Sequence, residues 1–167
     1  SNNQLTGKIP NEFSDLKNIQ SFNVDNNKLS GAIPASLSNI TSYVTVNISK
    51  NMFDSIPVFP NVQHLYMHEN NLAFDDVERN KPSSIYQYSP QDSIGSFRPV
   101  LKNEGDSFSV GIPVGGSNNS YKWYHNGQLI AGAISDSLHI SSVASQHSGK
   151  YQLQVTDTRY PSLTLYS

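Results

Sequence analysis

The sequence contains no cysteine, which excludes disulfide bridges, thiolate zinc sites, iron-sulfur clusters and cysteine nucleophiles. Charge is also sparse: 14% of the 167 residues are Asp, Glu, Lys or Arg, and 11 basic against 13 acidic residues leave a net charge of -2. Proteins that bind nucleic acid or anionic membranes usually carry a basic patch or run. Because this chain has none, we expect no nucleic-acid partner.

Long apolar runs are missing as well. Stretches such as residues 129–134 are far shorter than the roughly 20 apolar residues of a membrane-spanning helix, so we expect no membrane insertion. Asn, Ser, Thr and Tyr are abundant instead. A polar surface with so little charge is more typical of secreted modules than of cytosolic enzymes, in which about a quarter of the residues are charged. We therefore expect an extracellular or cell-surface location.

An internal repeat organises the first half of the chain. Residues 2–10 (NNQLTGKIP) recur 24 positions later as residues 26–34 (NNKLSGAIP), a third copy begins at residue 50, and a shorter unit brings Asn70 19 residues after Asn51. Apolar residues at alternate positions precede each later Asn, as in Phe22 and Val24. This pattern predicts a short strand followed by a turn whose Asn side chain bonds to buried backbone groups. The expected interior ladder consists of Asn3, Asn27, Asn51 and Asn70.

The pattern L-x-x-L-x-L-x-x-N-x-L over residues 1–73 resembles the leucine-rich repeat family. The L-[ST]-G-x-I-P element at residues 5–10 and 29–34 is similar to a subtype found in plant receptors and bacterial surface proteins. The resemblance implies a solenoid with parallel strands on a concave face and short helical turns on the convex side. We expect residues 74–79 to form a helix that closes the last repeat, capped by Asp75 or Asp76. The incomplete first repeat leads us to expect a fragment of a longer repeat protein.

The second half of the chain lacks this period. Residues 81–94, rich in Pro, Ser and Tyr, are expected to be a linker. Short alternating apolar runs follow, beginning at residue 108 and ending at residue 165, with turn signals between them. Several short strands at this spacing predict a β-sandwich.

The position of Trp123, 11 residues after Ile112 and 30 before Leu153, is similar to that in an immunoglobulin-like domain. The resemblance implies that Ile112 and Leu153 replace the two core cysteines and pack against Trp123. It also implies that Tyr151 forms the corner bond of that family, although His147 stands where the family usually has Asp. The predicted fold class is a leucine-rich repeat solenoid over residues 1–80 and an all-β immunoglobulin-like sandwich over residues 95–167. In animal proteins both modules normally carry disulfides, so the missing cysteines favour a bacterial protein.

Strand residues that alternate with the apolar positions are expected to project from the concave face. In the family this face usually binds the ligand, so the resemblance implies a protein, peptide or glycan partner. The alternative is that these side chains are only solvated strand positions. The candidate ligand-binding residues are Ser21, Asn23, Asp25, Thr45, Asn47, Ser49, His64, Tyr66 and His68.

No pattern in the sequence predicts catalysis. His64 and His68 are about 13 Å apart along a strand, too far to share one metal ion. A helix cap accounts for Asp75 and Asp76 more simply than calcium or acid-base chemistry, and the chain has no G-x-S-x-G, phosphate-loop or H-E-x-x-H motif. We therefore expect a non-enzymatic recognition or adhesion segment without cofactor or metal. The alternative is an accessory stalk or spacer of a larger secreted enzyme or receptor.

Overall fold

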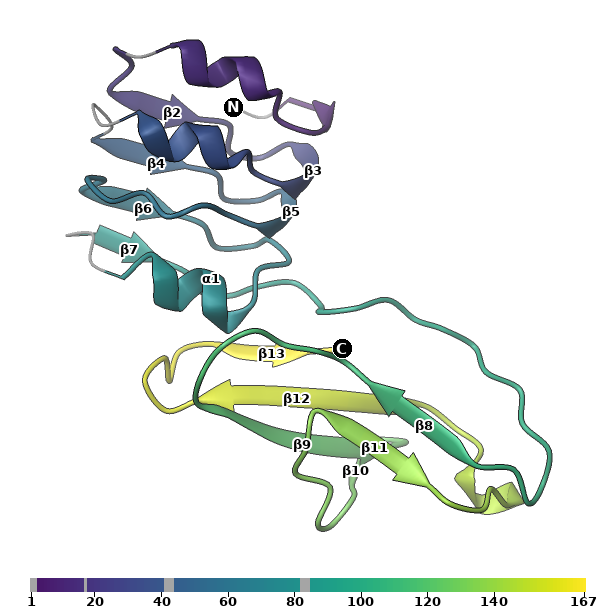
Figure 1. Cartoon of the computed structure of the whole chain (residues 1–167). Helices are drawn as coiled ribbons and strands as arrows, with labels where there is room; N and C mark the ends of the chain where they lie inside the picture. The colour runs from purple at the N-terminus through teal and green to yellow at the C-terminus, as the bar shows by residue number, and fades with distance from the viewer. Residues whose placement is uncertain (1–2, 17, 41–43, 82–84) are drawn as a thin grey trace. The chain divides into compact units, whose positions relative to one another are not determined.

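The computed structural model describes residues 3–16, 18–40, 44–81 and 85–167, and it is mostly β-structure with short helices (Figure 1). The chain divides into two compact units. The first comprises residues 1–92 and 115–117, and the second comprises residues 93–114 and 118–167. In the described part of the chain, no helix has the length and apolar character needed to cross a membrane.

Two parallel sheets build the first unit. The larger has the order β2 (Ser21–Asn23), β4 (Thr45–Asn47), β6 (His64–Tyr66) and β7 (Ile85–Gln87). The smaller has the order β1 (Thr6–Gly7), β3 (Lys28–Ala32) and β5 (Met52–Ser55). Each of the first three strands of the larger sheet buries its central apolar residue. These strands pair in parallel and in register, so successive repeats lie side by side. The buried central residues are Phe22, Val46 and Leu65.

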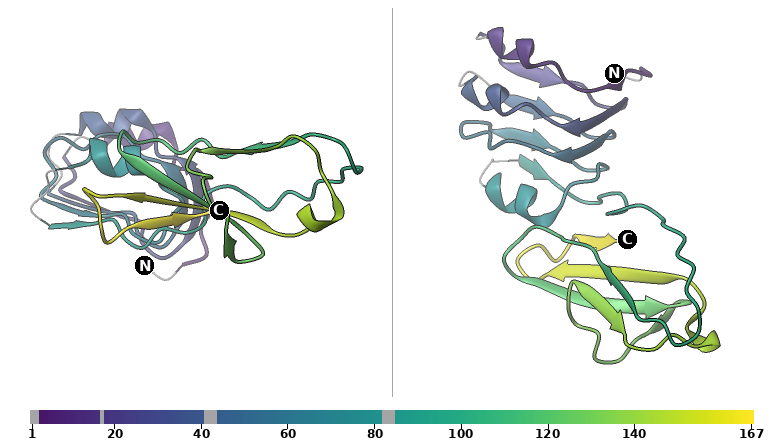
Figure 2. Two further views of the ribbon diagram at one scale, coloured as in Figure 1. Left: turned by 90° about the horizontal axis from the view of Figure 1, so that it is seen from below. Right: turned by 45° about the vertical axis from the view of Figure 1, so that its right-hand side comes forward.

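Short helices return the chain between the strands. They are η1 (Asn11–Asp15), η2 (Ala35–Asn39) and α1 (Phe74–Arg79), and Figure 2 shows them on one side of the stacked strands. Pro10 and Pro34 directly precede the first two helices, and Leu37 within η2 is completely buried. The helix predicted at residues 74–79 is thus present. Its N-cap is Ala73, and Asp76 accepts a hydrogen bond from the Ala73 N–H at 3.2 Å from within the first turn.

The glycine of the repeated L-[ST]-G-x-I-P element has a conformational role. Gly7 and Gly31 occupy equivalent positions and both have positive φ, 89° and 76°. The pairing of β3 with β5 shifts by one residue directly after Gly31. A side chain at this position would be strained, so the motif requires glycine there.

Side-chain amides join consecutive repeats in the interior. Asn27 Oδ1 accepts from Leu5 N–H at 3.2 Å, Asn51 Oδ1 from Leu29 N–H at 3.1 Å, and Asn70 Oδ1 from Phe53 N–H at 3.0 Å. The Nδ2 groups donate to carbonyls of the strand ends. Asn51 and Asn70 are buried and Asn27 is half-buried. Asn3, expected in this ladder, is exposed, because an interior position requires a neighbouring coil on both sides.

The segment expected to be a linker continues the first unit instead. Residues 85–87 form β7, which pairs in parallel with β6, and residues 82–84 lie outside the described residues. Gln91 takes the position of the next ladder residue: its Oε1 accepts from Leu72 N–H at 3.2 Å, and its Nε2 donates to Met67 O at 2.9 Å. The helix α1 is therefore not the last element of this unit. The prediction failed because the spacing changed and Gln replaced Asn.

Two antiparallel sheets build the second unit. One has the order β10 (Gln128–Leu129), β9 (Asn119–His125), β12 (Tyr151–Asp157) and β13 (Thr164–Tyr166). The other pairs β11 (Ser137–Ile140) with β8 (Phe108–Gly111), and η3 (Ser145–His147) precedes β12. Asn126 and Gly127 both have positive φ, 48° and 79°, as a two-residue hairpin turn between β9 and β10 requires.

Trp123 and Leu153 occupy the core of the second unit, 1% and 0% exposed, and face each other in the pairing of β9 with β12. The Trp123 Nε1–H donates to Ser135 O at 2.9 Å. Ile112, expected to be buried with them, is only half-buried. Tyr151 is half-buried, and its hydroxyl donates to the backbone oxygen of His147 at 2.9 Å. This bond does not need the missing Asp because the acceptor is a main-chain carbonyl.

Candidate functional site

The outward side chains of the larger parallel sheet form two straight rows. One row contains Ser21, Thr45 and His64, and the other contains Asn23, Asn47, Tyr66 and Gln87, because these residues are paired in register across adjacent strands. The residues of β2 in these rows are exposed and those of β4 and β6 are half-buried. We call these seven residues the polar face. Gln87 escaped the sequence analysis because β7 lies outside the 24-residue period.

The polar face contains no Lys, Arg, Asp or Glu, and His64 Nδ1 lies 3.5 Å from the Thr45 hydroxyl. Amide and hydroxyl groups offer both donors and acceptors, and the Tyr66 ring adds an aromatic surface. Such a set suits hydrogen bonding to backbone amides or sugar hydroxyls. It provides no strong attraction for a highly charged ligand.

Ser49 differs from its expected role as a surface residue. It is 4% exposed, its hydroxyl donates to Asn47 Oδ1 at 2.7 Å, and its N–H donates to the same oxygen at 3.2 Å. Asn23 accepts from Asp25 N–H in the same way at 3.0 Å. These local bonds turn the chain at the strand end, and Ser49, two residues before the ladder Asn51, is buried as a result.

Asp25 and His68 occupy the same position as Ser49 in their own repeats, and both are half-buried. Asp25 Oδ1 and His68 Nδ1 are buried without a hydrogen-bond partner among the described residues. Of the nine candidate residues, the structure therefore places six on the polar face and three at the strand ends beside it. The three at the strand ends are Asp25, Ser49 and His68.

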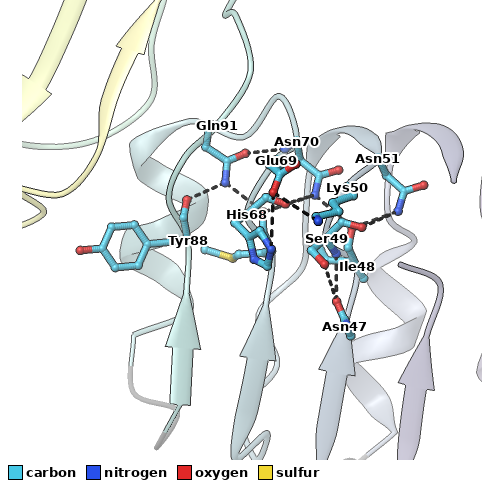
Figure 3. Close-up of polar contacts among 11 residues, drawn as sticks. Asn47, Ile48, Ser49, Lys50, Asn51, His68, Glu69, Asn70, Tyr88 and Gln91 are labelled. Carbon is cyan, nitrogen blue, oxygen red and sulfur yellow. Dashed lines mark hydrogen bonds and ion pairs between the residues drawn. The ribbon is translucent and has the colours of Figure 1, made fainter. Parts of the chain in front are cut away.

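A charged cluster at these strand ends escaped the sequence analysis. Lys50 Nζ and His68 Nε2 each lie 3.8 Å from Glu69 Oε1 (Figure 3). Lys50 and Glu69 have left-handed φ values of 57° and 55°, and so does Asn26 at 54°. The residue before each ladder Asn thus projects from a sharp turn. The Lys50 and Glu69 side chains are about half exposed and accessible to a partner at one edge of the polar face.

The amide ladder holds the main chain next to the charged cluster in place. Figure 3 shows the Asn70 and Gln91 amides bound to the main chain directly behind His68 and Glu69. Asn70 is completely buried, and its Nδ2 donates to Ile48 O at 3.0 Å in the neighbouring repeat. Because each amide joins two repeats, the side chains of the polar face are held on a fixed backbone.

The other residues considered as functional have structural partners. Asp76 is 2% exposed, accepts from Ile56 N–H at 3.0 Å and pairs with Arg79 at 2.7 Å; burial raises the pKa of its carboxyl despite these bonds. Asp75 also pairs with Arg79, at 2.6 Å. In the described parts of the chain, no three His, Cys, Asp or Glu side chains gather as a metal site.

A search of curated proteins found no match to the chain. A family model described as Leucine Rich Repeat matches residues 1–16 and 18–40. These residues contain β1, β2, β3 and the first two short helices, the part of the first unit in which the repeat spacing is regular. Leucine-rich repeats generally mediate protein binding and are generally not enzymes. The match supports leucine-rich repeats in the N-terminal 40 residues of the chain.

Proposed function

We propose that this chain is a non-enzymatic recognition or adhesion segment of a secreted or cell-surface protein. Its polar face binds a protein, peptide or glycan. The observation that carries the proposal is the polar face itself, two in-register rows of hydrogen-bonding side chains over a buried apolar layer. These rows combine an aromatic ring with amides and hydroxyls, and a ligand benefits from such a rigid array of donors and acceptors.

The wider architecture in this proposal is a curved solenoid followed by an immunoglobulin-like sandwich. The parallel sheets, the amide ladder and the family match over residues 1–40 support the solenoid. The buried Trp123 facing Leu153 and the Tyr151 bond to His147 support the immunoglobulin-like sandwich. The low charge and the absence of cysteine support a bacterial surface protein.

The ligand binds to side chains that are held in fixed positions before it arrives. The ladder fixes the strands, so a ligand meets side chains that lose little further freedom on association. Tyr66 contributes apolar contact area and a hydroxyl, while Asn23 and Asn47 provide amides in the same row. At the edge, Lys50 and His68 lie beside Glu69. This cluster favours ligands that carry a positive and a negative group close together over ligands that carry charge of one sign.

The test is a screen of the full chain against peptide, glycan and protein arrays. A variant with Ala at His64, Tyr66 and His68 is screened in parallel. Because His68 is partly buried, a second variant, Ser21→Arg, blocks an exposed part of the polar face without touching the interior. The control variant carries Ala at Asn11, Asn18 and Gln63, which are exposed outside the polar face. Circular dichroism verifies that all variants are folded.

We expect ligands that bind the chain and the control variant but lose at least about tenfold in affinity for both face variants. Ligands retained at full affinity by both face variants would contradict binding at the polar face.

A further inference from the structure

A pocket of about 240 Å³ lies within the second unit, where β9 ends and β12 begins. Both sheets of the unit line it, because it receives residues from β9 and β12 on one side and from β11 on the other. The loop after β10 and the helix η3 complete the wall. We call it the Tyr151 pocket, and its lining includes His125, Ile130, Leu138, Ile140, His147 and Tyr151.

The fold holds the wall of the pocket in place. His125 and Tyr151 are paired across β9 and β12, and their rings stack with centroids 4.6 Å apart and planes 17° apart. The Tyr151 hydroxyl is fixed at its other end by its bond to His147 O. Ile130 N–H donates to Trp123 O at 2.8 Å, which positions the loop after β10. A ligand would therefore meet a preformed site whose lining it does not have to order.

The size of the pocket suits a molecule with a single ring. A cavity of about 150 Å³ lined by aliphatic and aromatic side chains is large enough to bind benzene. The Tyr151 pocket is larger, so a ring with a small substituent fits within its volume.

The chemistry of the lining favours an aromatic ring over a sugar or an ion. No Lys, Arg, Asp or Glu lines the pocket, so a charged ligand would find no ion pair there. A sugar would bring several hydroxyl groups, and hydroxyls buried without partners cost free energy. Aliphatic side chains and stacked rings instead match the faces and edges of an aromatic ring.

His147 adds one hydrogen-bond donor to this apolar lining. Its Nδ1 accepts from Ala144 N–H at 3.0 Å. Because a neutral imidazole carries a single proton, that proton is on Nε2, which has no partner in the described part of the chain. The other two imidazoles at the pocket, those of His125 and His139, already have an oxygen atom 3.0 and 2.8 Å from a ring nitrogen. His147 thus offers an N–H group to an oxygen of the ligand.

We propose that the Tyr151 pocket binds a small phenolic molecule, that is, a single aromatic ring that carries a hydroxyl group. The ring packs between the aliphatic residues of β11 and the stacked rings of His125 and Tyr151. Its oxygen accepts from His147 Nε2–H. The inference concerns the second unit alone and does not depend on ligand binding by the polar face.

The experiment titrates para-cresol into the full chain and follows the backbone amides by NMR spectroscopy. We expect a Kd of about 1 mM or tighter, the range of ligands with few non-hydrogen atoms. The amide signals of Ile130, Leu138 and Tyr151 should shift, whereas those of the first unit should stay unchanged. A pentapeptide with Tyr between Gly residues is titrated in parallel. Tighter binding of this peptide than of para-cresol would assign the pocket to a partner's side chain and overturn the proposal.

His147→Asn tests the hydrogen bond. The Asn oxygen can replace Nδ1 as acceptor of Ala144 N–H, so the turn is kept while the Nε2–H donor is removed. We expect para-cresol to bind about fivefold more weakly to this variant. Toluene, which has no hydroxyl, should bind the variant and the unchanged chain equally.

A second pair of variants tests the location. Ile130→Trp fills the pocket from its loop and should lower the affinity for para-cresol at least about tenfold. The matched control is Leu129→Trp, at a neighbouring side chain that is 57% exposed and outside the pocket lining, and it should bind like the unchanged chain. Circular dichroism verifies that all variants are folded. Absence of shifts at the pocket amides, an equal loss of toluene and para-cresol affinity in His147→Asn, or full affinity in Ile130→Trp would each overturn the proposal.

Discussion

Buried amide side chains join neighbouring repeats of the first unit through hydrogen bonds to the main chain. Asn51 is the clearest case: it is 4% exposed, accepts from Leu29 N–H, and its Nδ2 donates to the carbonyls of Val24, Ile48 and Ser49. One side chain thereby satisfies four main-chain groups in two repeats. Main-chain groups left buried and unpaired are costly, so the stability of the unit depends strongly on this position.

Asn51→Ala tests this dependence. We expect the free energy of unfolding of the first unit to fall by about 2 kcal/mol, because the buried Leu29 N–H loses its acceptor and the carbonyls of Val24, Ile48 and Ser49 each lose one of two donors. Urea unfolding followed by far-ultraviolet circular dichroism measures the change. Asn61→Ala, at an exposed position of the same unit, serves as control and should change stability by less than about 0.5 kcal/mol. Equal effects of the two substitutions would show that the ladder is dispensable.

The contributions of two buried carboxylates, Asp157 and Asp76, to the stability of the fold change with pH in opposite directions. Hydrogen bonds from the Arg159 side chain, at 2.6 and 3.1 Å, hold the pKa of Asp157 below its usual value. This pair stabilises the fold above the unfolded pKa of 3.8, and its contribution is lost as pH falls through the lower folded pKa. Burial raises the pKa of Asp76, so its contribution to stability is present at low pH and lost as pH rises through its folded pKa.

Arg159→Met isolates the Asp157 contribution. Above about pH 5 we expect the free energy of unfolding of the second unit to be about 2 kcal/mol lower in the variant than in the unchanged chain. The reason is that the buried Asp157 carboxylate loses its charged hydrogen-bond donors. The difference should shrink as pH falls, because Asp157 without Arg159 takes up its proton at a higher pH than in the unchanged chain. Trp123 is the only Trp in the sequence and lies in the same unit, so its fluorescence reports this unfolding specifically. A difference that does not vary with pH would refute the assignment to Asp157.

At the scale of elements, β7 depends on Gln91. The strand has three residues and pairs only with β6 in the described sheet, so it gains little from its own ladder of hydrogen bonds. Gln91 joins it to the preceding repeat through Tyr88 O at 2.7 Å and Met67 O at 2.9 Å. The longer Gln side chain replaces Asn here at the end of the amide ladder.

Gln91→Ala should therefore loosen β7 without unfolding the rest of the first unit. We expect faster hydrogen exchange at the amides of Leu72 and Met67, by at least about tenfold, because the first loses its acceptor and the second bonds to Gln87 in β7. Exchange measured by mass spectrometry at peptide resolution provides the readout. The control is Gln87→Ala, at an exposed position of β7 itself. If this control loosens β7 as strongly, Gln91 has no special role.

At the scale of the whole molecule, the charge balance determines how a ligand is attracted. The net charge of -2 is small, and the polar face contains no Lys, Arg, Asp or Glu. Long-range electrostatic steering is therefore weak, and hydrogen bonds at short range provide the affinity.

We accordingly expect ligands of the polar face to change their Kd by less than about threefold between 50 and 500 mM NaCl. Titration calorimetry at both salt concentrations measures this, with Lys50→Ala as a comparison for the charged edge. A loss of affinity of two orders of magnitude in high salt would mean that the charged edge, and not the polar face, dominates binding.

Local patterns in the sequence predicted the elements of the first unit. The alternation around Phe22, Val46 and Leu65 predicted the strands because burying one side of a strand requires a period of two. The positions of Asn27, Asn51 and Asn70 followed from the repeat. Six of the seven residues of the polar face were predicted in the same way, as the alternate positions of those strands, and Gln87 was missed.

The sequence by itself thus determined the repeating core and the amide ladder, because each depends on residues close together in the chain and repeated at fixed spacing. Only the tertiary structure decided the burial of Ser49, the role of Gln91 and the place of β7. It also decided the charged edge at Lys50 and Glu69. These features depend on contacts between segments with no common period, where the path of the backbone sets which groups meet, and no local pattern records that path.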